Sequence, residues 1–426
     1  RYQSLSRGLG DVYKRQAKAY FLLFAVFIVL ISPVRGLALD PRVFYTDYYS
    51  STDDDIFVQN FTTSWSGEAS VHNTGNSGYM RWHVSATDAD NSEQVVLAVG
   101  TSPDTLYGSI YDGSSWTTKT FGSIYNYAYR GFHADYETES GQLLVVHSTD
   151  TSRQIRYWVW DGTSWVVNGS YFSFNAATVA SYRFHWIKLA SHPVTNQIAF
   201  MATNGYGEVV GLIWDGDTNT WGNEKKLSPN GVTTTAEEPI DVKYMQAGGN
   251  QGKALFVWGE SSEIHSWTWT GSAWDVSEKS HTAGSYAPYW VRLAADPNSD
   301  DMLVAYGDSG NDLHTINWTG SAWGTDRTID TALYGSYANN KPFDVIFESG
   351  SGHEGHAVIV YSDSLYVRYQ HTPDITGIWG GEVTLDSSDD CYWLEATRED
   401  DGTIHVAGME YYQSVYAWLV MYSWNN

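Results

Sequence analysis

Trp160-Asp161-Gly162-Thr163-Ser164-Trp165 is the stretch that decides the fold, because close copies of it return along the chain. The copies are residues 111–116 (YDGSSW), 269–274 (WTGSAW) and 318–323 (WTGSAW), together with 214–221 (WDGDTNTW), which has two more residues. Two weaker copies complete the series. The seven copies end, in order, at Trp65, Trp116, Trp165, Trp221, Trp274, Trp323 and Trp379, with spacings of 49 to 56 residues. A drifting period near 50 residues predicts an array of structural repeats.

Each repeat predicts strands and no helix. A run of apolar and aromatic residues precedes each turn, as at 155–160 and 313–318. In the turn, Gly162 can adopt a positive φ while Asp161 bonds to the backbone. Two further strand-like runs come earlier in each unit, and no segment shows a 3.6-residue apolar period. Three to four short strands in about 50 residues predict an all-β fold built from one repeated sheet.

The repeat resembles three propeller families. The Trp-Asp pair at the end of a strand resembles the WD repeat without its Gly-His pair, and the period resembles that of kelch repeats without their Gly-Gly pair. The turn is similar to the Asp-box of sialidase-like propellers, although the tryptophan follows Asp161 by four residues instead of five. The resemblance covers residues 39–426 at the level of fold and reaches no single family. It implies a β-propeller with four-stranded antiparallel blades.

Seven tryptophan turns favour seven blades. Eight is the alternative, because residues 43–49 and 56–61 add two strand candidates before the first complete unit. The last unit stops after a third strand at 415–424. We therefore expect an N-terminal strand to complete that blade and close the ring.

Composition excludes several classes of protein. The 426 residues carry 49 acids against 24 basic residues, a formal charge of −25, with 20 Trp, 31 Tyr and a single Cys. Disordered acidic chains are poor in aromatic residues, and nucleic-acid binders carry basic patches, so neither class fits. Cys391 alone can form neither an internal disulfide nor a cysteine-rich zinc site.

The first 38 residues are expected to lie outside the domain. Residues 4–16 (SLSRGLGDVYKRQ) resemble a translated sequencing adapter, so 1–16 is interpreted as an artefact. Residues 17–38 hold a twelve-residue apolar run after Lys18 and end in Gly36 and Ala38, which predicts a cleaved secretory signal. As a helix the run would rise about 18 Å, short of a bilayer core of about 30 Å, although an uncleaved anchor is the alternative.

On this interpretation residues 39–426 form one propeller domain that is secreted or held at the cell surface. Without the first 38 residues, which carry six basic residues and one acid, its formal charge is −30. The expected partner is an extracellular glycan or protein. No nucleic acid is expected, and no membrane unless the leader is uncleaved.

One position in the first strand of each unit holds a different residue from unit to unit, although the position beside it in the chain is always apolar or aromatic. It reads Ser85, His133, Lys188, Met245, Arg292, Ile346 and Glu395. A structural position in a repeat should be uniform, so we predict that Ser85, His133, Lys188, Arg292 and Glu395 converge near the axis as a ligand-binding column. The alternative is that they form ion pairs between blades or solvate the channel.

The seven repeated tryptophans are interpreted as structural, with ligand stacking as the alternative. A buried Trp removes about 150–250 Å² from water, worth roughly 4–6 kcal/mol before entropy is counted. We expect Trp165→Ala to destabilise the protein by several kcal/mol.

No motif identifies catalytic residues. A sialidase-like hydrolase or lyase would need an arginine cluster, for which Arg130, Arg183, Arg292 and Arg398 are candidates. The histidines show no His-x-x-x-His spacing, so no metal site is predicted, although acidic loops such as 296–301 would suit Ca²⁺. The sequence favours a non-enzymatic, glycan- or protein-binding propeller. The alternatives are the hydrolase or lyase and a structural cell-surface protein.

Overall fold

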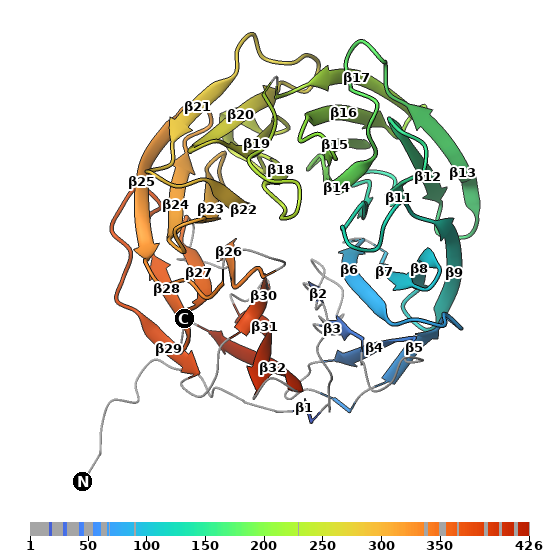
Figure 1. The fold of residues 1–426 in the computed structure, drawn as a ribbon, viewed down its shortest axis with the longest axis horizontal. Coiled ribbons are helices and arrows are strands. Elements are labelled where there is room, and N and C mark those ends of the chain that lie inside the picture. The colour runs from blue at the N-terminus through green and yellow to red at the C-terminus, as the bar shows by residue number, and fades with distance from the viewer. Residues whose placement is uncertain are drawn as a thin grey trace.

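The computed structural model forms a closed ring of sheets (Figure 1). It describes residues 17–18, 29–31, 42–46, 54–60, 66–67, 69–88, 91–228, 230–335, 340–348, 355–363, 366–386, 391–399, 403–412 and 416–425, with side chains between 42 and 409. The one helix in these ranges is a 3-10 turn, η1 (Gly248–Asn250). None of their helices is long and apolar enough to cross a membrane.

Strand pairing gives eight four-stranded sheets. The first four sheets are β2 (Val29–Ile31), β3 (Arg42–Tyr45), β4 (Asp55–Asn60), β5 (Ala69–Asn73); β6 (Met80–Thr87), β7 (Gln94–Thr101), β8 (Asp104–Tyr111), β9 (Trp116–Ser123); β10 (Phe132–Tyr136), β11 (Leu143–Ser148), β12 (Gln154–Trp160), β13 (Trp165–Ser173); and β14 (Phe184–Ser191), β15 (Gln197–Asn204), β16 (Val209–Asp215), β17 (Thr220–Lys226).

The other four sheets follow the same order from the axis outward. They are β18 (Ile240–Tyr244), β19 (Ala254–Glu260), β20 (Glu263–Trp269), β21 (Lys279–Thr282); β22 (Pro288–Ala295), β23 (Met302–Asp308), β24 (Leu313–Trp318), β25 (Trp323–Asp330); β26 (Phe343–Phe347), β27 (Ala357–Ser362), β28 (Val367–Thr372), β29 (Val383–Asp386); and β30 (Cys391–Arg398), β31 (Thr403–Tyr412), β32 (Tyr416–Asn425) with β1 (Ala17–Lys18). All pairs within the sheets are antiparallel.

Seven of the eight sheets are made of four consecutive strands, and these correspond to the seven tryptophan turns. The eighth sheet is composite, because β1 from the N-terminal part pairs with β32. An N-terminal strand therefore pairs with the last sheet, but it lies at 17–18, inside the segment predicted as a signal, whereas the candidates at 43–49 and 56–61 correspond to β3 and β4 of another sheet. The seven sheets of consecutive strands match the favoured count of seven, and the composite sheet brings the number of sheets to eight. Both β1 and β2 fall within 17–38, so cleavage of that segment, which stays a prediction, would leave the first and last sheets with three strands each.

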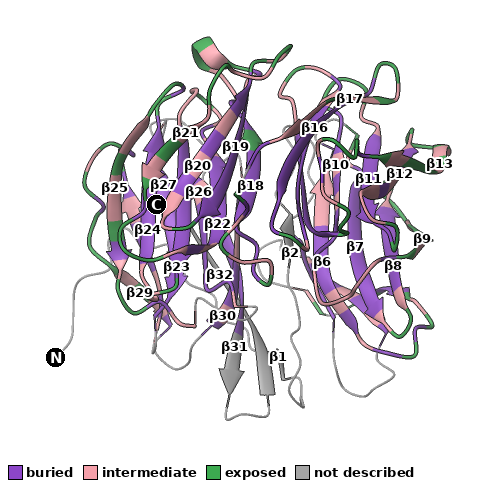
Figure 2. Ribbon diagram, turned by 45° about the horizontal axis from the view of Figure 1, so that its top comes forward, coloured by how far each residue is buried: buried purple, intermediate pink, exposed green. Residues whose placement is uncertain are grey.

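The core lies within and between the sheets. Second strands such as β11 and β19 are buried along their whole length, whereas the fourth strands are exposed on one face (Figure 2). An inner strand of one sheet packs against the inner strand of the next, and β30 contacts β2, which closes the ring. Large apolar side chains on both faces of each sheet thus hold neighbouring blades together.

The repeated turn is built as the sequence predicts. Oδ1 of Asp161 accepts hydrogen bonds from the backbone N–H groups of Thr163 (2.9 Å) and Ser164 (2.7 Å). Gly162 has a φ of +88°, which the absence of a Cβ makes accessible. These bonds, with those from the two hydroxyls, lower the pKa of Asp161 to about 2. Thr270 takes the same place in a later turn, where its hydroxyl oxygen accepts from the Ala273 N–H.

The tryptophans after these turns are half-buried and join adjacent sheets. Trp165 packs against Trp160 of its own turn (5.4 Å between ring centroids) and against Phe121 on β9 of the preceding sheet (5.4 Å). The ring pair within the turn recurs at 4.9–5.5 Å in four other units: Tyr111–Trp116, Trp214–Trp221, Trp269–Trp274 and Trp318–Trp323.

Two of these indoles also donate a hydrogen bond across the blade boundary. Nε1 of Trp274 binds the Asn223 carbonyl oxygen (2.7 Å), and Nε1 of Trp379 binds the Thr315 hydroxyl (3.2 Å). Trp65 lies outside the described residues. The described members of the series therefore occupy packing positions between blades.

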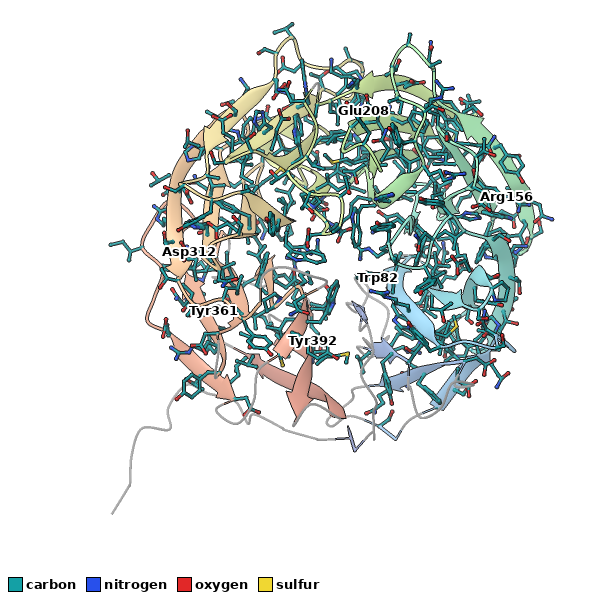
Figure 3. The ribbon with its side chains drawn as sticks, in the orientation of Figure 1. Trp82, Arg156, Glu208, Asp312, Tyr361 and Tyr392 are labelled. Carbon is teal, nitrogen blue, oxygen red and sulfur yellow. The ribbon has the colours of Figure 1, made fainter. Side chains whose placement is uncertain are left out.

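Four other tryptophans meet at the axis. Trp82, Trp186, Trp290 and Trp393 form a closed ring in which successive centroids lie 5.2, 5.9, 5.6 and 5.6 Å apart. All four are at most 2% exposed, and Figure 3 places Trp82 at the inner edge of the propeller. They come from β6, β14, β22 and β30, which are alternate inner strands.

A register shift accompanies each of these four tryptophans. The pairs β6–β7, β14–β15, β22–β23 and β30–β31 all shift register beside the Trp, whereas β10–β11, β18–β19 and β26–β27 run in continuous register. A β-bulge turns a side chain away from its regular direction, here toward the axis. Successive tryptophans of this ring are 103 or 104 residues apart in the chain, which is the length of two repeats. Blades with an axial tryptophan therefore alternate with blades without one.

Candidate functional site

A buried carboxylate gathers three cations near the axis. The Glu238 side chain is fully buried, just before β18. Its Oε2 lies 3.0 Å from Nη1 of Arg292 on β22, and its Oε1 lies 3.3 Å from Nζ of Lys188 on β14. Arg130, just before β10, also binds Oε1. Asp241 adds a second carboxylate 3.7 Å from Lys188.

The pKa shifts follow from this excess of cations. Burial alone would raise the pKa of Glu238, but Arg130, Lys188 and Arg292 together hold it well below its usual range. Burial, together with the positive charge of Arg292, lowers the pKa of Lys188 to about 7, although Asp241 and Glu238 act to raise it. Lys188 is thus the cation of this group that gives up its proton most easily.

A second group of charges occupies the same end of the later inner strands. Nζ of Lys341, which is fully buried, lies 3.0 Å from Oε1 of Glu395 and 3.7 Å from Oδ2 of Asp344. The same Glu395 oxygen accepts a hydrogen bond from Nε1 of Trp393 (3.0 Å), which ties the charges to the tryptophan ring. Arg292 interacts electrostatically with both groups.

Two of the carboxylates also connect blades through the backbone. Asp241 on β18 accepts from the N–H of Leu293 on β22, and Asp344 on β26 accepts from the N–H of Ala396 on β30, both at 2.9 Å. Each bond joins the inner strands of neighbouring sheets. The charges at the axis therefore hold the ring together and are themselves largely compensated.

The structure brings most of the predicted column together. Lys188 and Arg292 share Glu238, Glu395 pairs with Lys341, and the His133 pKa is pushed well below its usual range by burial and by Arg130 and Lys188. Ser85 is half-buried on β6, and no charged contact is found for it among the described residues. The contacts of Lys188, Arg292 and Glu395 have the distances of ion pairs between blades, which is the alternative that the sequence left open. Ligand binding by the column stays a prediction.

Sequence reasoning missed the other half of this network. The missed residues precede or lie on β18 and β26: Glu238, Asp241, Lys341 and Asp344. Arg130, just before β10, was named only as an arginine candidate for a hydrolase. Met245 lies one residue beyond β18, and Ile346 on β26 is not among the charged contacts, so the column was misaligned in these blades. Asp135, Asp241 and Asp344 recur at intervals of 106 and 103 residues, and a search for a two-blade period would have found them.

The arginine candidates for a hydrolase do not all converge. Arg130 and Arg292 meet at Glu238, but Arg183 donates to the Asp150 carbonyl oxygen and Arg398 to that of Phe347 (both 2.5 Å).

A pocket opens between two blades on the outer part of the ring. It has a volume of about 370 Å³ and is lined by Arg327, Thr328 and Ile329 of β25, by Gln370 of β28, and by Ile378 and Trp379 of the loop before β29. Both sheets contribute, so the pocket exists only where the two blades meet.

The polar groups of the pocket are held in place. Arg327 donates to the carbonyl oxygens of Ile375 (3.3 Å) and Thr376, which anchors the loop that carries Ile378. Nε2 of Gln370 donates to the Ile329 carbonyl oxygen (3.3 Å) and to the Tyr361 hydroxyl (3.0 Å). These hydrogen bonds fix the positions of Arg327 and Gln370 in the wall of the pocket.

The acidic loop at 296–301 uses its first carboxylate internally. Oδ1 of Asp296 accepts from the Asn298 N–H and Oδ2 from the Ser299 hydroxyl, both at 2.9 Å. These bonds shape the β22–β23 turn, and calcium binding there stays a prediction.

Comparison with known proteins identifies a fold and no family. No family model matches the sequence, and no curated protein matches it. The BP39L lectin of Burkholderia pseudomallei is similar in structure, with a TM-score of 0.57 and 14% identity over 86% of this chain and 100% of that one.

More distant similarities reach the Aleuria aurantia lectin (TM-score 0.41, 18% identity, 73% of this chain and 98% of that one) and the NanB sialidase of Streptococcus pneumoniae (0.46, 9%, 91% and 83%). The BP39L likeness and the repeated four-stranded antiparallel sheets together show that this chain is a β-propeller.

Proposed function

We propose that this protein is an exported glycan-binding propeller and that the pocket between β25 and β28 is its sugar site. The observation that carries the proposal is the lining of that pocket. An indole (Trp379) and two aliphatic side chains lie beside a guanidinium, a carboxamide and a hydroxyl. Sugars present C–H faces that pack on rings and hydroxyls that exchange hydrogen bonds with such groups.

The size and the charge of the pocket support binding. A volume of about 370 Å³ lies at the lower end of the range of roughly 300–1,000 Å³ for small-molecule sites, which suits one or two sugar rings. Glycoside hydrolysis ordinarily needs a pair of carboxylates, and the six lining residues include none. The fold-related Burkholderia protein is a lectin, which also supports the proposal. The predicted leader supports secretion or display at the cell surface.

The test is a glycan array on the full chain, followed by calorimetry with the best ligand. Arg327→Met and Thr328→Val should each weaken binding at least tenfold. Arg156→Met is the matched control, because Arg156 also donates to a backbone carbonyl (Gly169, 3.2 Å) but lies in another blade. Silence on the array, or equal losses in all three variants, would contradict the proposal. Turnover of a fluorogenic glycoside panel would favour the hydrolase alternative.

A further inference from the structure

Three metal-ligating side chains meet on the sheet β26–β29. Glu348 follows the last residue of β26, His356 precedes the first residue of β27, and His371 lies on β28. The Glu348 N–H donates to the His356 carbonyl oxygen (2.9 Å), which places the first two side by side. His371 pairs with Val358 on β27, two residues from His356, so that adjacent strands bring all three to one place.

The spacing of the ligand atoms matches a tetrahedral ion. Nδ1 of His356 lies 3.3 Å from Nε2 of His371, while Oε2 of Glu348 lies 3.6 Å from the first nitrogen and Oε1 of Glu348 lies 3.5 Å from the second. Zn²⁺ binds such atoms at about 2.0–2.2 Å in a tetrahedral arrangement, whose edges are then about 3.3–3.6 Å. A single ion can therefore contact both nitrogens and one oxygen of Glu348 after a small adjustment of the side chains.

The donor types and their exposure select the class of metal. Two imidazoles and a carboxylate suit Zn²⁺ and related transition-metal ions, whereas Ca²⁺ and Mg²⁺ prefer oxygen alone. The Glu348 side chain is 2% exposed, and those of His356 and His371 are 21% and 31% exposed. The histidines thus face solvent and leave a fourth position for water. The formal charge of −25 also favours a cation over an anion.

A second group of metal-ligating side chains lies in the preceding sheet, β22–β25. Asp308, Asp312 and His314 also converge, but Oδ1 of Asp308 accepts from the N–H groups of Gly310 (2.8 Å) and Asp312 (3.0 Å). That carboxylate shapes the β23–β24 turn, and only one nitrogen ligand is present. The Glu348 cluster supplies two nitrogens and is the better match for a transition metal.

We propose that Glu348, His356 and His371 bind one Zn²⁺ ion in each chain. Successive side chains of a strand point to opposite faces, so His371 and Gln370 face opposite sides of β28. The ion would connect β26, β27 and β28 on one face of β28, whereas Gln370 lines the sugar pocket from the opposite face of that strand. The site is independent of glycan binding and would not touch the sugar.

The experiment titrates metal-stripped full-length protein with Zn²⁺ by calorimetry and with Co²⁺ by visible absorption, without any glycan. We expect one tight site and the intense absorption of four-coordinate Co²⁺. The double variant His356→Gln/His371→Gln and the single variant Glu348→Gln should each lower the affinity at least tenfold. His281→Gln, on the outer strand β21, is the matched control and should change nothing.

Circular dichroism checks that each variant is folded, and Glu348→Gln carries the test if the double variant is not. The proposal is overturned if the wild type shows no tight site. It is also overturned if folded variants at Glu348, His356 and His371 bind Zn²⁺ as tightly as the control does.

Discussion

Replacing Glu238 by Gln tests whether the charges at the axis stabilise the ring. Glu238 is the carboxylate shared by Arg130, Lys188 and Arg292, and its side chain has no exposed surface. Gln keeps the volume and shape of the side chain but removes the negative charge. Two guanidiniums and an ammonium would then remain buried with Asp241 as the nearest carboxylate.

The size of the loss follows from that imbalance. Removing one partner of a buried ion pair costs about 3–5 kcal/mol, because the other charge stays buried without compensation. Lys188, whose pKa is already lowered to about 7, can release its proton and relieve part of the repulsion. We therefore expect Glu238→Gln to lower the free energy of unfolding by about 3 kcal/mol at pH 7, near the lower end of that range.

Lys188→Met is the matched variant. It removes one of three cations and leaves Arg130 and Arg292 on Glu238, so we expect a loss below about 1 kcal/mol, since apolar replacement of a buried ion is often close to neutral. In the double variant, Lys188→Met should recover part of the loss caused by Glu238→Gln. Urea unfolding followed by tryptophan fluorescence measures all three. The reasoning is refuted if Glu238→Gln lowers the free energy of unfolding by less than about 1 kcal/mol. It is also refuted if Lys188→Met lowers the free energy of unfolding as much as Glu238→Gln does.

Three further outcomes are expected. Trp165→Ala should destabilise the protein by roughly 3 kcal/mol, because the indole packs on Phe121 of the preceding sheet, and a melting temperature within one degree of wild type would contradict it. Hydrogen bonds lower the pKa of Asp161 from 3.8 to about 2. The contribution of Asp161 to stability is therefore present above pH 3.8 and is lost as the pH falls through about 2. The difference in stability between wild type and Asp161→Asn should shrink over that interval. Burial alone would lower the pKa of His314, but Asp308 and Asp326 raise it from 6.5 to about 9. Its contribution is therefore complete below pH 6.5 and lost as the pH rises through about 9, and pH-dependent melting of His314→Gln against wild type would disprove this if their difference stayed constant.

Strands were the part of the fold that the sequence could predict. Runs such as 155–160 and 313–318, which are rich in apolar and aromatic residues, correspond to β12 and β24, because strand-forming composition and the turn chemistry of Asp161 are local properties. The sequence predicts Met245 in the first strand of its unit, whereas β18 spans Ile240–Tyr244 and ends one residue earlier. That unit has no axial tryptophan to mark its register.

The candidate site was less predictable because its contacts join residues far apart in the chain. Arg130 and Glu238 are 108 residues apart and belong to sheets with a third sheet between them, so their pairing depends on how the inner strands converge at the axis. The cluster of Glu348, His356 and His371 has spacings of 8 and 15 residues, which match no local metal motif. It becomes visible only when the strand pairing of β26, β27 and β28 is known.

The axial tryptophan ring also limits how this propeller can change in blade number. Each member of the ring is separated from the next by one blade of the other kind, so the pattern closes only when the two kinds alternate without interruption. Insertion or deletion of a single blade would place two like blades side by side and break the even spacing of the tryptophans. The regular ring of tryptophans is therefore compatible with the gain or loss of two blades together and not with the gain or loss of one.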